Sequence, residues 1–215
     1  MPTITDLAGP VGPLEALLDE PTSATVRAAV VFAHPHPQFG GTMHTKVVYQ
    51  GAKALTRIGC AVLRFNFRGV GRSAGSFSGG TGETDDFRAA LDYMAGRYPG
   101  ARMWSAGFSF GAWVALESGA QDDRVSALIG VAPPVATSIS GRNYTFEHTL
   151  QSTKPKFFVQ GEADEVCPLE AMWAFYAKMP EPRELVVIDA ADHLFEGKTQ
   201  EAGEALEDLL ADFYG

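Results

Sequence analysis

Residues 107–111 of the chain read Gly-Phe-Ser-Phe-Gly, and they lie between two segments of different character. The extended apolar run at residues 101–106 predicts a buried strand. The small and apolar side chains of residues 112–117 predict a helix. The pattern Gly-x-Ser-x-Gly between a strand and a helix is typical of a nucleophile elbow, a strained turn that exposes the serine hydroxyl. Ser109 is therefore the candidate nucleophile of the chain.

The two glycines of this pentapeptide have a steric explanation. Glycine is used where a backbone passes so close to its neighbours that no side chain fits. At Gly107 and Gly111 a side chain would strike the neighbouring strand or keep the following helix from packing closely. We expect neither position to accept a larger residue.

The same pattern occurs a second time at residues 71–75, Gly-Arg-Ser-Ala-Gly, after a strand-like run at residues 61–67. The residues that follow, Ser-Phe-Ser-Gly-Gly, cannot begin a helix. Residues 69–74 also imitate a dinucleotide-binding loop. That interpretation fails because the helix is missing and because no acidic residue ends a following strand at the expected distance. The context therefore favours Ser109 over Ser73.

Length and composition predict one compact domain over residues 1–215. With 46% hydrophobic residues, the chain can bury one large core with little left for a second. A net charge of −9 and the lack of a basic run argue against a nucleic-acid partner. The two cysteines, Cys60 and Cys167, form no disulfide framework and indicate a reducing compartment. Without a signal-peptide pattern in residues 1–20 or an apolar run of membrane-spanning length, we expect a cytoplasmic location and no membrane partner.

Strand-like and helix-like segments alternate along the chain. The predicted strands are residues 28–33, 61–67, 101–106, 125–132, 156–160 and 185–189, and the predicted helices are residues 47–55, 84–94, 112–117, 171–179 and 202–213. This alternation predicts an α/β fold, a mostly parallel and doubly wound sheet with helices on both faces. Such sheets carry their chemistry in the loops at the carboxyl ends of the strands.

A serine hydroxyl is a weak nucleophile, so it needs a base to take its proton and an anion to orient that base. His193 comes just after the predicted strand at residues 184–189, and Asp164 comes just after the strand at residues 156–160. The chain order serine, aspartate, histidine is one of the known orders of a catalytic triad. We therefore predict Ser109, Asp164 and His193 as catalytic residues.

Four other carboxylates compete with Asp164 for the role of the anion. Asp192 is adjacent to His193, and the side chain of a sequence neighbour rarely turns back to the imidazole. The remaining rivals near the two loops are Glu162, Glu165 and Asp189. Asp164 is favoured because its place after the strand fits the chain order.

The chemistry also needs two backbone N–H groups that bind the negative oxygen of the intermediate, an oxyanion hole. The first comes from the residue after the nucleophile, Phe110, and the second from the loop after an early strand. That loop, residues 33–41, contains Pro35 and Pro37, which have no N–H to donate. His36 is therefore the favoured second donor, with Gln38 as the alternative.

The histidines of this loop also allow a different interpretation, a metal site formed by His34, His36 and His44. Metal sites of this kind usually include an acidic or thiol ligand, and none accompanies these three residues. We therefore expect no metal ion and no organic cofactor.

Together these motifs resemble a known family. They are residues 34–41 (His-Pro-His-Pro-Gln-Phe-Gly-Gly), 64–73, 107–111, 161–164 and 192–193. They look like the small α/β-hydrolases related to dienelactone hydrolase, in particular the bacterial serine hydrolases with an HPHP loop. The resemblance extends from about Leu14 to Phe213. It implies an α/β-hydrolase fold, a triad at positions 109, 164 and 193, hydrolysis of carboxylic esters, and a structural role for the loop at residues 68–73.

One departure decides between two chemistries of that family. Dienelactone hydrolase itself uses a cysteine nucleophile, whereas this chain has Ser109, and its two cysteines lie elsewhere. The resemblance therefore implies ordinary serine-esterase chemistry. A thioesterase or peptidase with the same triad, or a binding protein without catalysis on the same fold, are the alternatives.

The size of the substrate is predicted from the length of one connection. Only residues 133–153 separate two predicted strands at the place where this fold inserts a lid, so we expect a minimal cap and an open site for small or short-chain esters. Candidate pocket walls, each also a plausible core residue, are Phe39, Phe108, Phe110, Met172, Trp173, Leu194 and Phe195.

Overall fold

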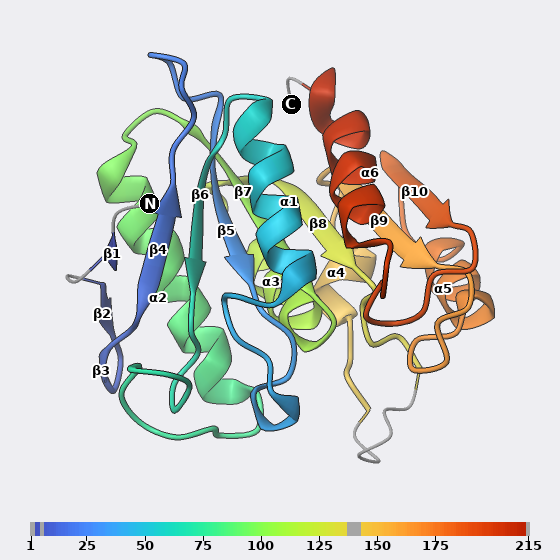
Figure 1. The fold of residues 1–215 in the computed structure, drawn as a ribbon, viewed down its shortest axis with the longest axis horizontal. Helices are drawn as coiled ribbons and strands as arrows, with labels where there is room; N and C mark the ends of the chain where they lie inside the picture. Colours follow the sequence, from blue (N-terminus) through green and yellow to red (C-terminus); the bar gives the residue numbers. More distant parts are fainter. Residues whose placement is uncertain (1–2, 5–6, 137–142, 214–215) are drawn as a thin grey trace.

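The computed structural model describes residues 3–4, 7–136 and 143–213 of the chain. Its main feature is an eight-stranded sheet with helices on both faces (Figure 1). The strand order is β1-β4-β6-β5-β7-β8-β9-β10. From β6 to β10 neighbouring strands are parallel, whereas β4 and β1 add antiparallel at one edge. The predicted α/β class with a mostly parallel sheet is confirmed.

The elements have the following bounds. The strands of the sheet are β1 (Thr3–Ile4), β4 (Ala16–Asp19), β5 (Ala28–Ala33), β6 (Ala61–Phe65), β7 (Arg102–Phe108), β8 (Val125–Val131), β9 (Lys156–Gly161) and β10 (Arg183–Ile188). The helices are α1 (Lys46–Arg57), α2 (Thr81–Arg97), α3 (Phe110–Gln121), α4 (Glu147–Gln151), α5 (Leu169–Tyr176) and α6 (Thr199–Ala211), with a 3-10 turn η1 at Pro37–Phe39. A separate two-stranded hairpin pairs β2 (Ala8–Gly9) with β3 (Gly12–Pro13).

The central strands are apolar on both sides because both faces of the sheet are covered. Side chains alternate across a strand, so each strand contributes to two hydrophobic clusters. In β5, Val30 and Phe32 join the cluster under α1 and α6, whereas Val31 and Ala33 join the cluster under α2 and α3. Figure 1 shows α1 and α6 in front of the sheet, with α2 and α3 behind it.

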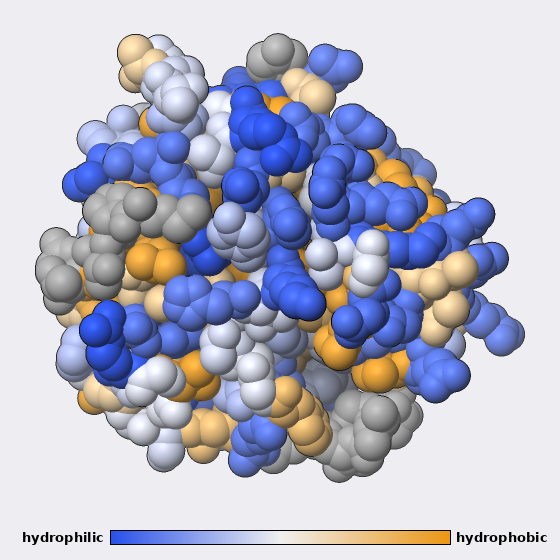
Figure 2. Space-filling model, viewed as in Figure 1, coloured by the Kyte–Doolittle hydropathy of each residue, from blue (hydrophilic) through white to orange (hydrophobic). Residues whose placement is uncertain are grey.

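The outer side of the α1 and α6 layer is hydrophilic. In the same view, Figure 2 shows mostly hydrophilic residues over these two helices, with hydrophobic residues in small scattered groups. The apolar sides of α1 and α6 therefore face inward and hold the helices on the sheet. Among the described residues, every helix is either too short or too polar to cross a lipid bilayer.

The edge formed by β1 and β4 was not predicted. A two-residue strand such as β1 is too short to show the alternation of polar and apolar residues that predicts a strand. Its backbone groups are paired because the adjacent strand β4 offers hydrogen-bond partners. β4 pairs with β6 through Leu17 and Arg64, and its Ala16 and Leu18 are fully buried. The side chains of Arg64 and Asp19 form a buried ion pair at 2.6 Å, which joins β4 to β6 as well.

Helix α2 begins three residues before the predicted start at Thr84. Glu83 explains the earlier start, because its carboxylate accepts hydrogen bonds from the backbone N–H of Gly80 at 2.6 Å and of Ser78 at 3.0 Å. These bonds satisfy donors at the helix start. Asp86 lies in the second turn of the helix and is fully buried.

The carboxyl ends of the parallel strands meet at one end of the sheet, the lower end in Figure 1. β7, β8, β9 and β10 are consecutive in the sheet, and β5 lies next to β7. The loops that carry the candidate site residues follow β5, β7, β9 and β10, so the topology brings them to the same rim.

Candidate active site

Ser109 occupies a sharp turn between β7 and α3. Its backbone has φ 54° and ψ −121°, a conformation that L-residues rarely adopt outside strained functional turns. The turn is held on both sides, because Ser109 N–H donates to the carbonyl of Val131 at 2.9 Å and its carbonyl accepts from Ala112 N–H at 2.8 Å. This is the geometry expected of a nucleophile elbow.

The steric role of the two glycines is confirmed. A Cβ at Gly107 would lie 2.1 Å from the carbonyl oxygen of Gly111. A Cβ at Gly111 would lie 2.4 Å from the carbonyl oxygen of His34, in the loop after β5. Both distances are far below a van der Waals contact, so α3 can sit this close to the turn and to β5 only when both residues are glycine.

The side chains of His193, Ser109 and Asp164 lie in one hydrogen-bonded chain. His193 Nε2 is 2.9 Å from Ser109 Oγ, and His193 Nδ1 is 2.9 Å from Asp164 Oδ2. The carboxylate can only accept, so the neutral ring carries its proton on Nδ1 and offers Nε2 as the acceptor for the serine hydroxyl. The Asp164 side chain is fully buried and that of His193 is 14% exposed.

Asp164 is oriented by its own loop. Its Oδ1 accepts hydrogen bonds from the backbone N–H of Val166 at 2.9 Å and of Cys167 at 2.7 Å. Its Oδ2 accepts from Gln160 Nε2 at 2.9 Å, in addition to the bond from His193. Both oxygens therefore accept two donors each, and the carboxylate has one preferred orientation.

The rival carboxylates have other partners or point into solvent. Glu162 accepts from the N–H of Ala190 at 2.9 Å, and Asp192 accepts from the N–H of Glu196 at 2.8 Å. Glu165 and Asp189 are exposed. Of the five carboxylates considered, Asp164 is the one that contacts the His193 ring.

The residues that carry the two proposed oxyanion donors contact each other through their side-chain rings. Phe110 is the first residue of α3, so its N–H belongs to the group that a helix leaves without an intrahelical partner. The rings of Phe110 and His36 are 5.0 Å apart between centroids. Gln38, the alternative donor, gives its N–H to His36 Nδ1 at 3.2 Å. That bond engages the Gln38 N–H and so argues against Gln38 as the second donor.

His34 has a structural position. Its Nε2 accepts from the backbone N–H of Phe67 at 3.0 Å, which places the ring proton on Nδ1, 2.6 Å from the carbonyl oxygen of Pro35. Burial lowers the pKa of His34 to about 4, so the ring is neutral at pH 7. Both nitrogens are engaged, and His34 therefore has no lone pair to offer a metal ion.

The geometry also fits poorly with a metal ion beside the candidate base. Within the described part of the chain, one group of potential ligands has all its donor atoms within 4.8 Å of one another, namely Asp164, Cys167 and His193. Burial raises the pKa of the Cys167 thiol, and the Asp164 carboxylate raises it further, so the thiol stays protonated. The carboxylate oxygens are already occupied by donors. These residues suit a hydrogen-bonded network better than a metal site.

The second Gly-x-Ser-x-Gly sequence belongs to a structural loop. Ser73 is buried, donates to the carbonyl oxygen of Asn66 at 2.7 Å and accepts from the N–H of Glu15 at 2.9 Å. Arg68 and Asp86 form a buried two-point ion pair, with nitrogen–oxygen distances of 3.0 and 2.7 Å. The loop is thus fixed both to Glu15, just before β4, and to α2, and the Ser73 hydroxyl is engaged in two hydrogen bonds rather than free to act as a nucleophile.

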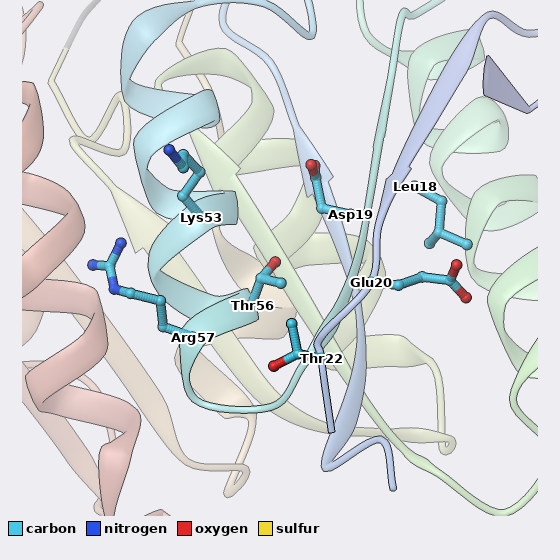
Figure 3. A pocket seen from close by; sticks show the side chains of 7 residues that line it. All are labelled: Leu18, Asp19, Glu20, Thr22, Lys53, Thr56 and Arg57. Atoms are coloured by element: carbon cyan, nitrogen blue, oxygen red, sulfur yellow. The ribbon is translucent and has the colours of Figure 1, made fainter. Parts of the chain in front are cut away.

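A cavity of about 700 Å³ lies away from these residues. Figure 3 shows α1 on one side of it, with Lys53, Thr56 and Arg57, and the end of β4 with the following turn on the other. Asp19 in its wall is at the carboxyl end of β4, which runs antiparallel, so the cavity is at the amino ends of the parallel strands. Asp19 pairs with Arg64 and Arg57 pairs with Glu207. These two charges are balanced by neighbours, and the residues that line the cavity include no serine, cysteine or histidine.

The candidate pocket walls separate into two groups. Phe108, Phe110, Met172 and Phe195 are buried core residues, whereas Phe39, Leu194 and Trp173 are 72%, 55% and 47% exposed. Of the predicted minimal cap, residues 137–142 lie outside the described residues, and the described part forms the short helix α4.

One residue that contacts the site was not singled out from the sequence. Gln160, in β9, donates to the candidate acid Asp164. The available signal was a polar side chain near the end of a strand that otherwise reads as buried and apolar. Such a residue must find a partner when it is buried, and here the partner lies four positions ahead.

The comparison with known proteins agrees with the observed fold. The family profile of the α/β hydrolase domain matches residues 26–214. The chain belongs to the α/β hydrolase family. This α/β hydrolase is 39% identical to an α/β serine hydrolase homologue from Coxiella burnetii, with a TM-score of 0.88 and 97% of each chain covered.

Two further relatives are similar over most of the chain. A structure from Xanthomonas campestris, described as a member of the α/β serine hydrolases without a lid, is 37% identical with a TM-score of 0.85 and covers 97% of this α/β hydrolase and 93% of its own chain. An uncharacterized protein of Rickettsia prowazekii (strain Madrid E) is 36% identical over 208 residues, 94% of this chain and 86% of that protein. Serine hydrolases among the relatives support a general hydrolase activity.

Proposed function

We propose that this α/β hydrolase is a serine carboxylesterase that cleaves small or short-chain carboxylic esters through an acyl-enzyme on Ser109. The observation that carries the proposal is the chain of two 2.9 Å contacts from Ser109 through His193 to Asp164. Residues 1–215 would act as one catalytic unit. The reaction needs neither a metal ion nor an organic cofactor, because serine, base and acid supply the nucleophile and all proton transfers.

The first half of the reaction forms the acyl-enzyme. His193 Nε2 takes the hydroxyl proton while Ser109 Oγ bonds to the carbonyl carbon of the ester, and the carbonyl oxygen becomes an oxyanion. Asp164 stabilises the imidazolium that results. The carbon–oxygen bond to the alcohol then breaks, and the alcohol leaves with the proton from His193.

The second half releases the acid. Water gives a proton to His193 Nε2 and attacks the acyl carbon, and the bond to Ser109 Oγ breaks as that oxygen regains the proton. In both halves, the backbone N–H groups of Phe110 and His36 bind the oxyanion. Loss of one such donor typically raises the barrier by about 2.7–4 kcal/mol.

Two observations support a small substrate. The described connection between β8 and β9 contains one short helix, α4, of 5 residues. The similar Xanthomonas campestris structure is described as having no lid. Exposed apolar side chains in the segments that follow β5, β9 and β10 suit the apolar part of a short acyl or alcohol group; they are Phe39 in η1, Trp173 in α5 and Leu194 in the loop after β10.

Within the α/β hydrolases, we place the chain with the dienelactone-hydrolase-like serine enzymes that carry an HPHP loop. Two contacts support the structural use of this motif: His34 ties the loop to the end of β6 through Phe67, and the His36 ring packs on Phe110. The motif therefore fixes the position of the second oxyanion donor. A serine in place of the cysteine nucleophile favours simple esters over dienelactones.

A fluorophosphonate probe with mass-spectrometric site mapping tests the proposal. We expect the label on Ser109, and p-nitrophenyl esters should react fastest with acetyl to butyryl chains. Ser109→Ala should abolish both, whereas Ser73→Ala, at the other Gly-x-Ser-x-Gly, should keep the label on Ser109. Faster turnover of a matched thioester or anilide would assign the alternative acyl-transfer activities. A folded wild-type chain with no label and no turnover would favour a non-catalytic binding protein.

A further inference from the structure

Gln160 bridges the two ends of the loop that carries the candidate acid. It precedes Gly161, the last residue of β9, and its side chain is fully buried. Its Nε2 lies 2.9 Å from Asp164 Oδ2 and 2.7 Å from the backbone carbonyl oxygen of Cys167. One amide group thus holds the carboxylate and the far end of its loop at the same time.

The chemistry of these partners fixes the orientation of the amide. A carboxylate oxygen and a carbonyl oxygen can only accept, so the NH₂ group must face them. The reversed amide would place Oε1 against two acceptors and is excluded. The observed orientation leaves Gln160 Oε1 buried without a hydrogen-bond partner among the described residues. A buried unpaired acceptor destabilises the fold, so the contribution of this residue must come from its donor group.

The contacted oxygen is the one that matters for the base. Asp164 Oδ2 accepts from both Gln160 Nε2 and His193 Nδ1. We propose that Gln160 is a positioning residue that holds Asp164 Oδ2 toward His193 and keeps the Asp164 loop closed through Cys167. This inference rests on the proposed function, because it assumes that Asp164 and His193 activate Ser109.

The effect on catalysis follows from the geometry. Without the Gln160 donor, the carboxylate keeps two backbone donors on Oδ1 but loses one of the two groups that direct Oδ2. The His193 ring then samples orientations in which Nε2 no longer faces Ser109 Oγ. No proton moves to or from Gln160, and it touches no substrate, so its loss should lower kcat and leave KM close to the wild-type value.

Gln160→Met separates positioning from stability. Methionine has nearly the same length and no polar group, so this variant removes the Nε2 donor together with the unpaired Oε1. We expect kcat to fall about 10-fold to 100-fold. Mutation of the residues that hydrogen-bond to metal-ligating histidines has effects of this size. The melting temperature should change little, because the loss of the unpaired buried Oε1 offsets the loss of the bond to the Cys167 carbonyl oxygen. A structural residue would show the reverse, a lower melting temperature with kcat unchanged.

Gln160→Glu adds a pH signature. When it is protonated, the carboxyl group introduced by this variant can donate one hydrogen bond to Asp164 Oδ2 and so replace the amide. When two carboxyl groups lie side by side, the pKa of one of them rises, because two adjacent negative charges repel each other. We expect this variant to retain most activity on the acidic side of the profile and to lose it as the pH rises. Such a falling limb should be absent from the wild type and from Gln160→Met.

Ser118→Ala is the matched control. Ser118 Oγ is also buried without a partner among the described residues, but it lies near the far end of α3 from Ser109. This variant removes an unpaired polar atom and should keep wild-type kcat, KM and pH profile.

Each outcome has a definite meaning. A wild-type chain that is neither labelled at Ser109 nor active on p-nitrophenyl esters overturns the proposed function. An active wild type with Gln160→Met at full kcat, or with a melting temperature that falls together with kcat, overturns this inference alone. A Gln160→Met chain that does not fold has the same consequence, because the inference requires the fold to tolerate this change. A Gln160→Glu profile parallel to that of the wild type also contradicts it.

Discussion

At the residue scale, the site depends on the separate roles of the two oxygens of one carboxylate. Asp164 Oδ1 is held by the backbone of its own loop, which leaves Oδ2 for the His193 ring and for Gln160. Because this carboxylate is fully buried, water cannot replace a hydrogen-bond donor that is lost, so each donor contributes more to its stability and orientation. The orientation of the imidazole therefore depends on a hydrogen-bond network that extends beyond the three candidate catalytic side chains.

Asp164→Asn tests this network while it changes few atoms. The amide can keep the shape of the side chain, but its NH₂ group favours the wrong tautomer of His193 and cannot stabilise the imidazolium. By the behaviour of other triads, kcat should fall by about 10⁴-fold with p-nitrophenyl acetate. Asp192→Asn, next to the base in sequence but bonded to the Glu196 N–H, is the control and should change kcat little. Equal losses in the two variants would remove Asp164 from its proposed role.

His34 makes the stability of the chain depend on pH. Its pKa is about 4 in the folded chain, mainly because burial disfavours the charged ring, and about 6.5 after unfolding. The unfolded chain therefore binds more protons between these values. The stability from a neutral His34 is fully present above pH 6.5 and is lost as the pH falls toward 4, by up to about 3 kcal/mol.

The measurement is urea unfolding of the wild type, of His34→Gln and of His148→Gln between pH 4.5 and 7. His34→Gln should show a flatter dependence of the free energy of unfolding on pH, even if it is less stable at pH 7. His148→Gln changes an exposed histidine and should keep the wild-type slope. Three parallel slopes would show that His34 does not carry this effect.

At the scale of elements, the close approach of α3 to β5 sets the position of the nucleophile. The Gly111 backbone passes so near the His34 and Ala33 carbonyls that a Cβ would lie 2.4 and 2.6 Å from their oxygens. Helix α3 begins at Phe110, so any shift of its first turn moves both the Ser109 turn and the proposed first oxyanion donor. The close packing of α3 on β5 therefore also fixes the geometry of the candidate site.

Gly111→Ala should damage both stability and activity. We expect the free energy of unfolding to fall by about 3 kcal/mol, because the backbone must shift to make room, and kcat to fall with it. Gly96→Ala is the control in α2, where a Cβ meets nothing within 4 Å. It should raise the free energy of unfolding by about 0.5–1 kcal/mol, since alanine is the better helix former. Chemical denaturation and ester hydrolysis of both variants check these expectations, and a stable, active Gly111→Ala chain would contradict them.

The same scale explains which parts could be predicted from the sequence. The strands β5, β7, β8 and β9 are nearly continuous apolar runs, because both faces of a parallel sheet are buried. The candidate residues Ser109, Asp164 and His193 follow from a turn motif and from their places after such strands. The short strand β1 and the start of α2 could not be predicted. The first depends on a partner strand, and the second on a side-chain contact from Glu83 to Gly80.

Gln160 shows a different limit of the sequence. Its role depends on a hydrogen bond to Asp164 across a loop, and no periodic pattern encodes the direction of an amide group. A polar residue in a buried strand indicates that a partner exists, but only coordinates identify it. The same holds for the ion pair of Arg68 with Asp86, which fixes the loop that contains Ser73.

At the scale of the whole molecule, the parallel sheet collects loops that are distant in sequence. Ser109 and His193 are 84 positions apart, and His193 and Asp164 are 29 apart, yet their loops follow β7, β10 and β9 at one rim. The cavity beside α1 lies at the opposite end of the strands, where the charged groups pair with one another. The fold thus separates a reactive end from a structural end.

The charge of the molecule should influence which esters reach the reactive end. A net charge of −9 creates a negative potential around the protein that opposes the approach of anions and that salt screens. For an anionic ester such as p-nitrophenyl hydrogen succinate, kcat/KM should therefore rise severalfold between low and high ionic strength. Neutral p-nitrophenyl butyrate is the control and should show little change. If the anionic ester reacted more slowly as salt was added, a local positive surface at the rim would outweigh the net charge, and the preference for neutral substrates would be wrong.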